Sequence, residues 1–297
     1  LRKEADSEVN TEEIIETAYD LQSGSYVASL AMLSFRQHKQ DYGEAIAKLL
    51  KGLLPEGGSV LEPGVGEGTT LSFVKKSCGV GFGEFHGFDI SWSRIATCRE
   101  WLAAQKMMDV FLAVASIFHA PYQDNSFDVV YTSHTVEPNG GQEFPILKEL
   151  YRIASRYLVL LEPGYELASD EAQERMRRLG YVRGLKDKAE NLGMRVVRHE
   201  LFPMTANPLN PTALTVIEKN RAARSVSPQL ACPRYGDSLQ NGADSLYSSG
   251  SMRAYPKILG IPCLRVEDGI IASQYFQHAQ SAGHPGPSTS AVRPKAA

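Results

Sequence analysis

The stretch from Ser59 to Thr70, SVLEPGVGEGTT, constrains the fold more than any other segment of the chain. A short apolar run is followed by an acid and then by glycines at Gly64, Gly66 and Gly68, and residues 70–76 have a helical pattern. Glycines permit positive φ and let a ligand lie close against the backbone. A helix N-terminus adds free N–H groups and the positive end of a dipole. The stretch therefore predicts a strand, a tight glycine turn and a helix start that face a ligand.

A second acid follows one helix and one strand later. Gly83 to Ser91 reads GEFHGFDIS, a strand-like piece that ends in Asp89. In a doubly wound sheet, an acid at the end of the second strand faces the ribose hydroxyls of a nucleotide. A carboxylate suits this position because it accepts hydrogen bonds and donates none. Asp89 or Ser91 also has the chemistry to cap the helix expected over 92–105, and both roles are compatible.

These two motifs resemble those of the class I S-adenosylmethionine (SAM)-dependent methyltransferases, usually written [DE]-x-G-x-G-x-G and GxDxS. The spacing differs from the G-x-G-x-x-G of dinucleotide-binding folds. The resemblance implies SAM as the cofactor, with its methionine moiety held by the loop of Gly64, Gly66 and Gly68. It further implies that Glu62 organises that end of the cofactor and that Asp89 binds the ribose.

A third stretch, SIFHAPYQDNSFD over residues 116–128, resembles the family string D-x-x-x-L-P-F-x-D-x-S-F-D. In the family the first Asp binds the adenine amino group, and the backbone N–H of the next residue binds the ring. This chain has Ser116 at the first position, which is a weaker acceptor than a carboxylate. The resemblance therefore implies an adenine contact at the Ile117 backbone and an altered one at Ser116.

The ends of two later strands supply the candidate residues for chemistry. SHTVEPNGG, from residue 133, resembles the SxxxLEH segment of the family, which implies a cofactor contact at Ser133 and a role for Glu137. His134 has a side-chain pKa near neutrality, as a general base requires, although a structural role is the alternative. LEPGYELAS places Tyr165 and Glu166 at the same carboxyl edge, either near a substrate or in a solvated turn.

The N-terminal region predicts helices that cover the pocket. Residues 11–21 have helical spacing, and a long amphipathic helix lies within 26–54 before Pro55. AYDLQSGSY resembles the segment that covers the SAM pocket in many small-molecule methyltransferases. The resemblance implies substrate contacts for Tyr19 and Tyr26. Simple packing of these rings against the sheet is the alternative.

The order of the elements predicts an α/β fold, a doubly wound, Rossmann-like and mostly parallel sheet. Strands are expected at 59–61, 84–88, 109–115, 127–132 and 157–161, with helices between them. Two further pieces, 194–202 and 214–220, match the antiparallel hairpin that closes the family's sheet. Residues 170–191 are charged and helical, either a solvated face or an arginine-rich site for an anionic substrate.

The C-terminal region predicts a small α+β or all-β module. Within residues 229–278, the pieces Cys232-Pro233, Tyr255-Pro256 and Gly260-Ile261-Pro262 resemble the CPxC and YPIxxGIPxL motifs of the zinc-ribbon-like domain in the tRNA-methyltransferase activator family. Tyr235, Ser248 and Ser251 stand where that family has cysteines, which leaves only Cys232 as a ligand. Zinc needs four N or S ligands, so we expect no metal and a module that docks on the methyltransferase core. The expected divisions are the N-terminal helices within residues 1–58, a core of residues 59–219, the module 229–278 and a disordered tail 279–297.

Composition narrows the function further. The 297 residues carry a net charge of −3, which argues against a general nucleic-acid surface. The charged N-terminus, the lack of a membrane-length apolar run and four cysteines without a C-x-x-C pair predict a cytoplasmic protein. We expect a small-molecule methyl acceptor, a sugar or a biosynthetic intermediate. Methylation of tRNA, rRNA or protein, and a non-catalytic partner-binding subunit, are the alternatives. The sequence leaves the acceptor, the methylated atom and the oligomeric state open.

Overall fold

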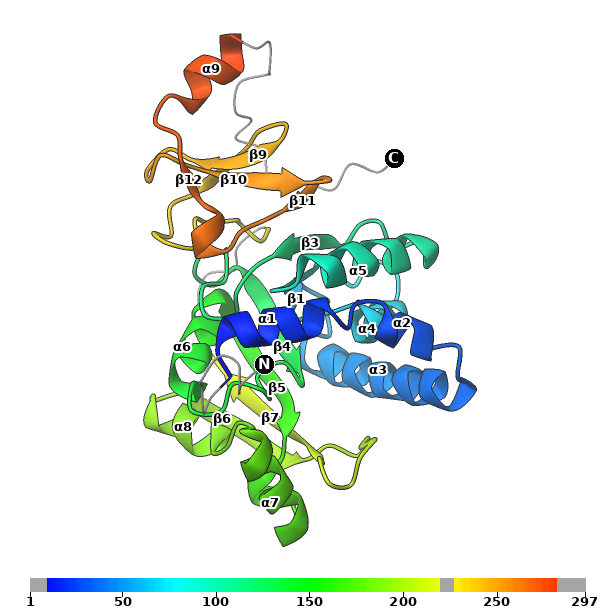
Figure 1. Cartoon of the computed structure of the whole chain (residues 1–297). Coiled ribbons are helices and arrows are strands. Elements are labelled where there is room, and N and C mark those ends of the chain that lie inside the picture. The colour runs from blue at the N-terminus through cyan, green and yellow to red at the C-terminus, as the bar shows by residue number, and fades with distance from the viewer. Residues whose placement is uncertain (1–9, 220–226, 282–297) are drawn as a thin grey trace.

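A seven-stranded sheet forms the centre of the computed structural model, which describes residues 10–219 and 227–281 (Figure 1). The strand order is β3-β2-β1-β4-β5-β7-β6. The strands are β1 Val60–Pro63, β2 Phe85–Asp89, β3 Phe111–Val114, β4 Phe127–Ser133, β5 Ala154–Pro163, β6 Arg195–Leu201 and β7 Thr212–Glu218.

The direction of the strands confirms the predicted fold class. The pairs β1–β2, β2–β3, β1–β4 and β4–β5 are parallel, whereas β7 pairs antiparallel with both β5 and β6. After β3 the chain crosses back to place β4 on the other side of β1. Such a change of strand order opens a crevice at the carboxyl ends of the strands, where α/β sheets bind ligands.

Helices cover both faces of the sheet, because strands buried on both sides need two apolar layers. One layer contains α3 (Leu33–Leu53), α4 (Thr69–Cys78) and α5 (Trp92–Ala104), and the other contains α6 (Glu143–Ile153) and α8 (Leu185–Asn191). The neighbours Val60 and Leu61 on β1 belong to different cores, since successive strand residues point to opposite faces.

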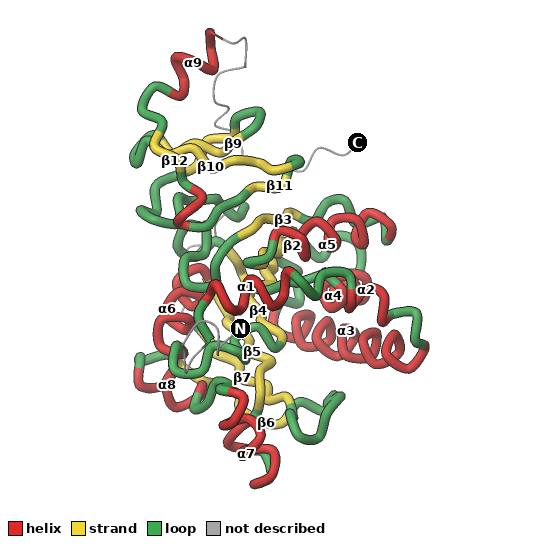
Figure 2. The backbone as a smooth tube through the Cα atoms, viewed as in Figure 1, coloured by secondary structure: helices red, strands yellow, loops and turns green. Residues whose placement is uncertain are grey.

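Two short helices precede α3, namely α1 (Glu12–Asp20) and α2 (Ser25–Ser29). We call residues 10–32 the N-terminal segment. Thr11 caps α1 by accepting a hydrogen bond from the Ile14 N–H, as its position before two acids predicts. In the view of Figure 2, α1 passes in front of β1 and β4, and α2 lies near α4.

The prediction of one helical stretch over 170–191 is wrong in its middle. The chain instead forms α7 (Asp170–Leu179) and α8, after the short 3₁₀ turn η1 (Tyr165–Leu167). Gly180 and Gly184 between the two helices have φ of +70° and +65°. Glycine adopts this left-handed conformation readily; Gly180 ends α7, and Gly184 precedes the first residue of α8.

The C-terminal module forms a second, antiparallel sheet in the order β11-β10-β9-β8, with β12 also paired to β10. The remaining elements are β8 Leu239–Asn241, β9 Ser245–Ser248, β10 Arg253–Ile258, β11 Ile261–Pro262, η2 Val266–Asp268, β12 Ile270–Ile271 and α9 Tyr275–Ser281. Helix α9 takes in residues 279–281, the start of the predicted disordered tail; the rest of that tail, 282–297, lies outside the described residues, as do the stretches 1–9 and 220–226.

The module contacts the open edge of the large sheet. The Leu264 N–H donates to the Val114 carbonyl over 2.8 Å, and Val114 and Cys263 form a parallel bridge. Leu264 and Tyr255 belong to the same apolar cluster as residues of α6. Backbone groups at the edge strand β3 are thereby satisfied by the same chain, which protects this edge from pairing with other chains.

Three of the four positions compared with zinc ligands meet inside the module. Cys232 Sγ lies 3.6 Å from Ser251 Oγ, and Ser251 Oγ donates to Ser248 Oγ over 2.7 Å. The Tyr255 hydroxyl lies 3.2 Å from the same sulfur, while Tyr235 is exposed. Neutral hydrogen-bonding groups therefore fill this centre. Within 10–219 and 227–281, no group of three or more His, Cys, Asp or Glu side chains is placed to hold a metal ion, and no helix is long and apolar enough to cross a membrane.

Two glycines of α3 allow a matched test of the packing that holds this helix on the core. A Cβ at Gly43 would lie 2.5 Å from Phe73 Cβ, whereas one at Gly52 would meet nothing within 4 Å. We expect Gly43→Ala to lower the free energy of unfolding by about 1–3 kcal/mol through overpacking. Gly52→Ala should leave it unchanged or raise it by up to about 1 kcal/mol, because alanine favours the helix. Urea unfolding of both variants checks this, and equal effects would contradict it.

Candidate functional site

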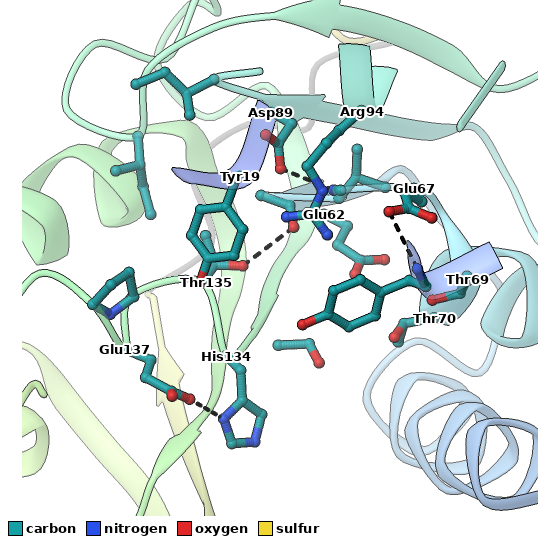
Figure 3. Close-up of a pocket in the computed structure, with 18 of the residues that line it drawn as sticks. Tyr19, Glu62, Glu67, Thr69, Thr70, Asp89, Arg94, His134, Thr135 and Glu137 are labelled. Carbon is teal, nitrogen blue, oxygen red and sulfur yellow. Dashed lines mark hydrogen bonds and ion pairs between the residues drawn. The ribbon is translucent and has the colours of Figure 1, made fainter. Parts of the chain in front are cut away.

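A cavity of about 390 Å³ lies at the carboxyl edge of the sheet (Figure 3). Its walls come from the N-terminal segment, α3, the loop between β1 and α4, the end of β2, the loop after β4 and the loop between β6 and β7. Segments from both ends of the core domain thus meet at the position where the strand order reverses.

The glycine loop forms one wall, and its conformation needs glycine. Gly64, Gly66 and Gly68 have φ of +64°, +54° and +70°. A Cβ at Gly64 would lie 2.1 Å from Thr135 Cγ2, and one at Gly66 would lie 2.6 Å from Arg94 Nη2. Side chains at these positions would be strained and would clash with their neighbours. The loop therefore presents bare backbone to the cavity, as the sequence predicts.

The buried carboxyl group of Glu62 lies at one end of the cavity and accepts a hydrogen bond from the Tyr131 hydroxyl. Burial raises the pKa of Glu62 to about 8, against the lowering effects of that hydrogen bond and of Lys39. Lys39 on α3 lines the same cavity, and its Nζ donates to Thr70 Oγ1 over 3.0 Å. Burial lowers the pKa of Lys39. Glu62 and Lys39, an acid and a base that are both largely withdrawn from water, thus lie at the same end of the cavity.

Asp89 ends β2 and ties the glycine loop to it. Its Oδ2 accepts from the Gly66 N–H and its Oδ1 from the Ser91 N–H, both over 3.0 Å. Burial raises the pKa of Asp89, although Arg94 and these backbone donors act in the opposite direction. Ser91 caps α5 by accepting from the Arg94 N–H. A carboxylate oxygen has two lone pairs, so Asp89 keeps acceptor capacity toward the cavity.

Arg94, which sequence analysis missed, lies between the two predicted tyrosines. Its guanidinium is 4.9 Å from the Tyr19 ring centroid and 5.1 Å from that of Tyr26. All three side chains line the cavity, and Arg94 Nε has no hydrogen-bond partner among residues 10–219 and 227–281. Both tyrosines therefore line the cavity, and the buried Arg94 cation lies against their rings.

Acidic side chains hold the N-terminal segment in place. Glu67 of the glycine loop accepts from the Gly24 and Val27 N–H groups over 3.1 and 2.7 Å. Asp20 accepts from the Ser91 hydroxyl over 2.7 Å and from the Ser93 N–H over 3.2 Å. The segment is thus fastened to the glycine loop and to the start of α5, both of which face the cavity.

His134 and Glu137 point toward each other in the loop after β4 (Figure 3). His134 Nδ1 is 2.5 Å from Glu137 Oε2, and its Nε2 is 2.8 Å from Thr212 Oγ1. Burial lowers the pKa of His134, but the Glu137 carboxylate outweighs this effect, so the net shift is upward. The same contact lowers the pKa of Glu137. Ser133 also lines the cavity, with its hydroxyl 3.2 Å from that of Tyr42.

The structure gives Ser116 a partner that the sequence did not suggest. Its hydroxyl donates to Glu12 Oε1 on α1 and accepts from the Phe118 N–H over 3.0 Å. Ile117 lines the cavity next to it. Glu12 is more than a hundred residues away in the chain, so no local pattern connects it to Ser116.

Tyr165 and Glu166 are not brought to this cavity. They lie in η1, where Glu166 Oε1 accepts from the Gly184 N–H over 2.5 Å and the Tyr165 ring centroid lies 5.8 Å from the Arg183 guanidinium. Within the described residues, neither of the two belongs to the cavity lining. The carboxyl end of β5 contributes Glu162 instead, whose carboxylate accepts from the Thr135 and Glu137 N–H groups.

Comparison with known proteins agrees with this geometry. Residues 60–156 match the model of a family described as a methyltransferase domain. This region is therefore similar to a methyltransferase domain, and the SAM cofactor and Rossmann-like fold predicted from the sequence agree with the match. No curated protein matches the chain in sequence.

Two solved structures show the same fold. Magnesium protoporphyrin IX methyltransferase from Synechocystis PCC 6803, with bound S-adenosylhomocysteine (SAH), has a TM-score of 0.54 at 13% identity; the match covers 71% of this chain and 100% of that one. The [4+2]-cyclase SpnF also has a TM-score of 0.54, at 12% identity, with 72% of this chain and 98% of that one covered.

The His134–Glu137 contact makes a prediction about protonation. Glu137→Gln removes the carboxylate and leaves the burial, so the pKa of His134 should fall from above its ordinary value of 6.5 to below it. Titration of the imidazole C–H resonance by NMR checks this, with His134→Asn identifying the signal. Glu166→Gln, which changes an acid outside the cavity, should leave the pKa unchanged.

The same shift has a consequence for stability. Because the pKa of His134 is raised in the folded protein, its protonated form stabilises the fold below pH 6.5. That contribution is lost as the pH rises through the folded-state pKa. A His134 resonance with the same pKa in the wild type and in Glu137→Gln would contradict both statements.

Proposed function

We propose that the chain transfers a methyl group from SAM to a small-molecule acceptor held in this cavity. One observation carries the proposal: a bare glycine cradle lies between two buried carboxyl groups, Glu62 and Asp89, in one cavity at the switch point of the sheet. The match of residues 60–156 to a methyltransferase domain supports it.

The residues present fit the amino acid and ribose portions of SAM. Lys39 and Glu62 offer opposite charges to the carboxylate and ammonium of an amino acid. Asp89 keeps acceptor capacity for two ribose hydroxyls, and the positive φ of Gly66 lets a ligand approach the backbone. Arg94 remains available for a further polar contact through Nε. SAM supplies an electrophilic methyl group on a sulfonium.

The chain contributes to the reaction by aligning the methyl acceptor with SAM. Where the acceptor atom carries a proton, the chain also removes that proton. Methyl transfer is an in-line displacement, so holding the acceptor at the correct angle supplies much of the acceleration. His134 Nε2, now against Thr212 Oγ1, is the atom that accepts a proton from the acceptor. Glu137 on Nδ1 then stabilises the imidazolium that forms.

The cavity wall beyond His134 favours a small acceptor. Phe35 and His38 of α3 and Met204 and Asn207 of the β6–β7 loop line it, which offers apolar surface with a few polar groups. The N-terminal segment, held by Glu67 and Asp20, adds Tyr19 and Tyr26 to the wall of the same cavity. A pocket of mixed polarity walled in this way suits a metabolite more than a polymer such as tRNA.

Binding measurements test the proposal first. Calorimetry with SAM and SAH should show saturable binding of both and none of NAD. Gly66→Val and Asp89→Asn should each weaken SAH binding by about tenfold or more, because a Cβ fills the cradle and a charged acceptor is lost. Asp109→Ala, at an exposed ion pair with Lys75, serves as the control and should bind as the wild type does.

The outcomes separate the alternatives. Melting temperatures show whether each variant is folded. A folded wild type that binds neither ligand would contradict the proposal and favour the non-catalytic, partner-binding role. Binding that is unchanged in both site variants would contradict the proposed site.

A second prediction concerns Glu62. Its pKa of about 8 keeps the side chain protonated at pH 7, and a ligand ammonium group beside it favours the ionised form. SAH binding at pH 7 should therefore release up to about one proton, seen as a dependence of the calorimetric heat on the ionisation enthalpy of the buffer. Glu62→Gln should abolish the release, and Glu44→Gln, on the exposed side of α3, should not.

A further inference from the structure

One part of the cavity lining is largely apolar, and we call this part the apolar compartment. Its lining comes from the end of β2, the loop after β3 and the helix α1 of the N-terminal segment. The apolar side chains are Ile15, Phe88, Ile90, Ile117 and Phe118. Flat aromatic ligands fit compartments of this kind, since apolar walls on both sides bury their faces.

One charged side chain lies at the edge of this compartment. Glu12, in the first turn of α1, lines the cavity and accepts the hydroxyl hydrogen of Ser116 through Oε1. The hydroxyl of Ser116 accepts in turn from the Phe118 N–H over 3.0 Å. Ser116 therefore has its one hydrogen committed to Glu12, and the carboxylate supplies the acceptors at this edge.

An acceptor-only group at the edge of an apolar compartment selects for a ligand with an N–H donor on its rim. Adenine carries such a donor in its exocyclic amino group, whereas hypoxanthine has a carbonyl at that position and would face the carboxylate with a like partial charge. We propose that Glu12 of α1 reads the base of the ligand by accepting a hydrogen bond from the adenine amino group. This inference rests on the proposed function, because it assumes an adenosyl ligand.

The position of Glu12 gives the recognition a structural consequence. The core residue at this edge, Ser116, offers only a hydroxyl, so the carboxylate arrives from a segment that precedes the sheet in the chain. Asp20 fixes the other end of α1 to Ser91 and Ser93, and Glu16 in its middle pairs with Arg265 of the C-terminal module over 2.6 Å. Base recognition therefore requires α1 to be in place over the cavity.

The test compares SAH with its 6-oxo analogue, S-inosylhomocysteine, by calorimetry. The wild type should bind SAH at least about tenfold more tightly than the analogue, the range expected for one hydrogen bond to a charged group. Glu12→Gln should weaken SAH binding about ten- to a hundredfold and reduce the preference for the amino base. Glu13→Gln is the matched control: it removes the neighbouring acid from the same exposed first turn, so it reports the effect of helix charge alone.

A rescue variant separates the loss of the carboxylate from any effect of Glu12→Gln on the structure of α1. Ser116→Asp in the Glu12→Gln background returns a carboxylate to the same edge from the core and should restore both the affinity and the preference. Ser116→Asp alone places two carboxylates together, so it should bind SAH more weakly than the double variant.

The outcomes keep this inference apart from the proposed function. A wild type that does not bind SAH contradicts the proposed function. A wild type that binds SAH, with Glu12→Gln no weaker than Glu13→Gln or with its base preference intact, overturns only the role of Glu12. If Ser116→Asp raised the affinity for SAH equally in the wild type and in the Glu12→Gln background, that result would also overturn it.

Discussion

Buried carboxylates satisfied by backbone N–H groups fix the shape of the site. Asp89 joins the glycine loop to β2, Glu67 holds the turn before α2, and Glu162 gathers the loop after β4. A carboxylate withdrawn from water is costly unless several donors face it. Each of these acids therefore organises a loop that has no regular backbone pairing of its own. The glycine cradle, the N-terminal segment and the His134–Glu137 pair all depend on this arrangement.

The features of the site that follow from the sequence are local in the chain. The glycine loop and Asp89 each lie directly after a strand, and their spacing reflects one helix and one strand of fixed length. The parallel order of the strands then brings their carboxyl ends to one edge. The helix break at Gly180–Gly184 was harder to predict from the sequence, because the charged residues on both sides of it have a continuous helical pattern. Tyr165 and Glu166 follow a correctly predicted strand, but they lie in the 3₁₀ turn η1 and outside the lining of this cavity, and the strand pattern gave no sign of that turn.

Glu12, Lys39 and Arg94 could not be found by reading the chain in order. Each is a charged residue on a helix, and such a residue is normally a solvated one. Their roles arise from contacts across the fold: Glu12 with Ser116, Lys39 with Thr70, and Arg94 with two tyrosine rings. The substitution at Ser116 was a usable signal, since it indicated that a carboxylate was missing from the core. It did not indicate which segment would replace it.

The fold alone does not choose a reaction, because the same architecture is found in a methyltransferase and in a [4+2]-cyclase. The electrostatics of the cavity are more specific. Burial raises the pKa of Glu62 and lowers that of Lys39, so both groups lie in a cavity where their charged forms are disfavoured. A zwitterionic ligand compensates both at once. In the free protein, the burial of these two polar groups lowers the stability of the fold. A ligand that pairs with both groups removes part of this cost, and the free energy recovered contributes to its affinity.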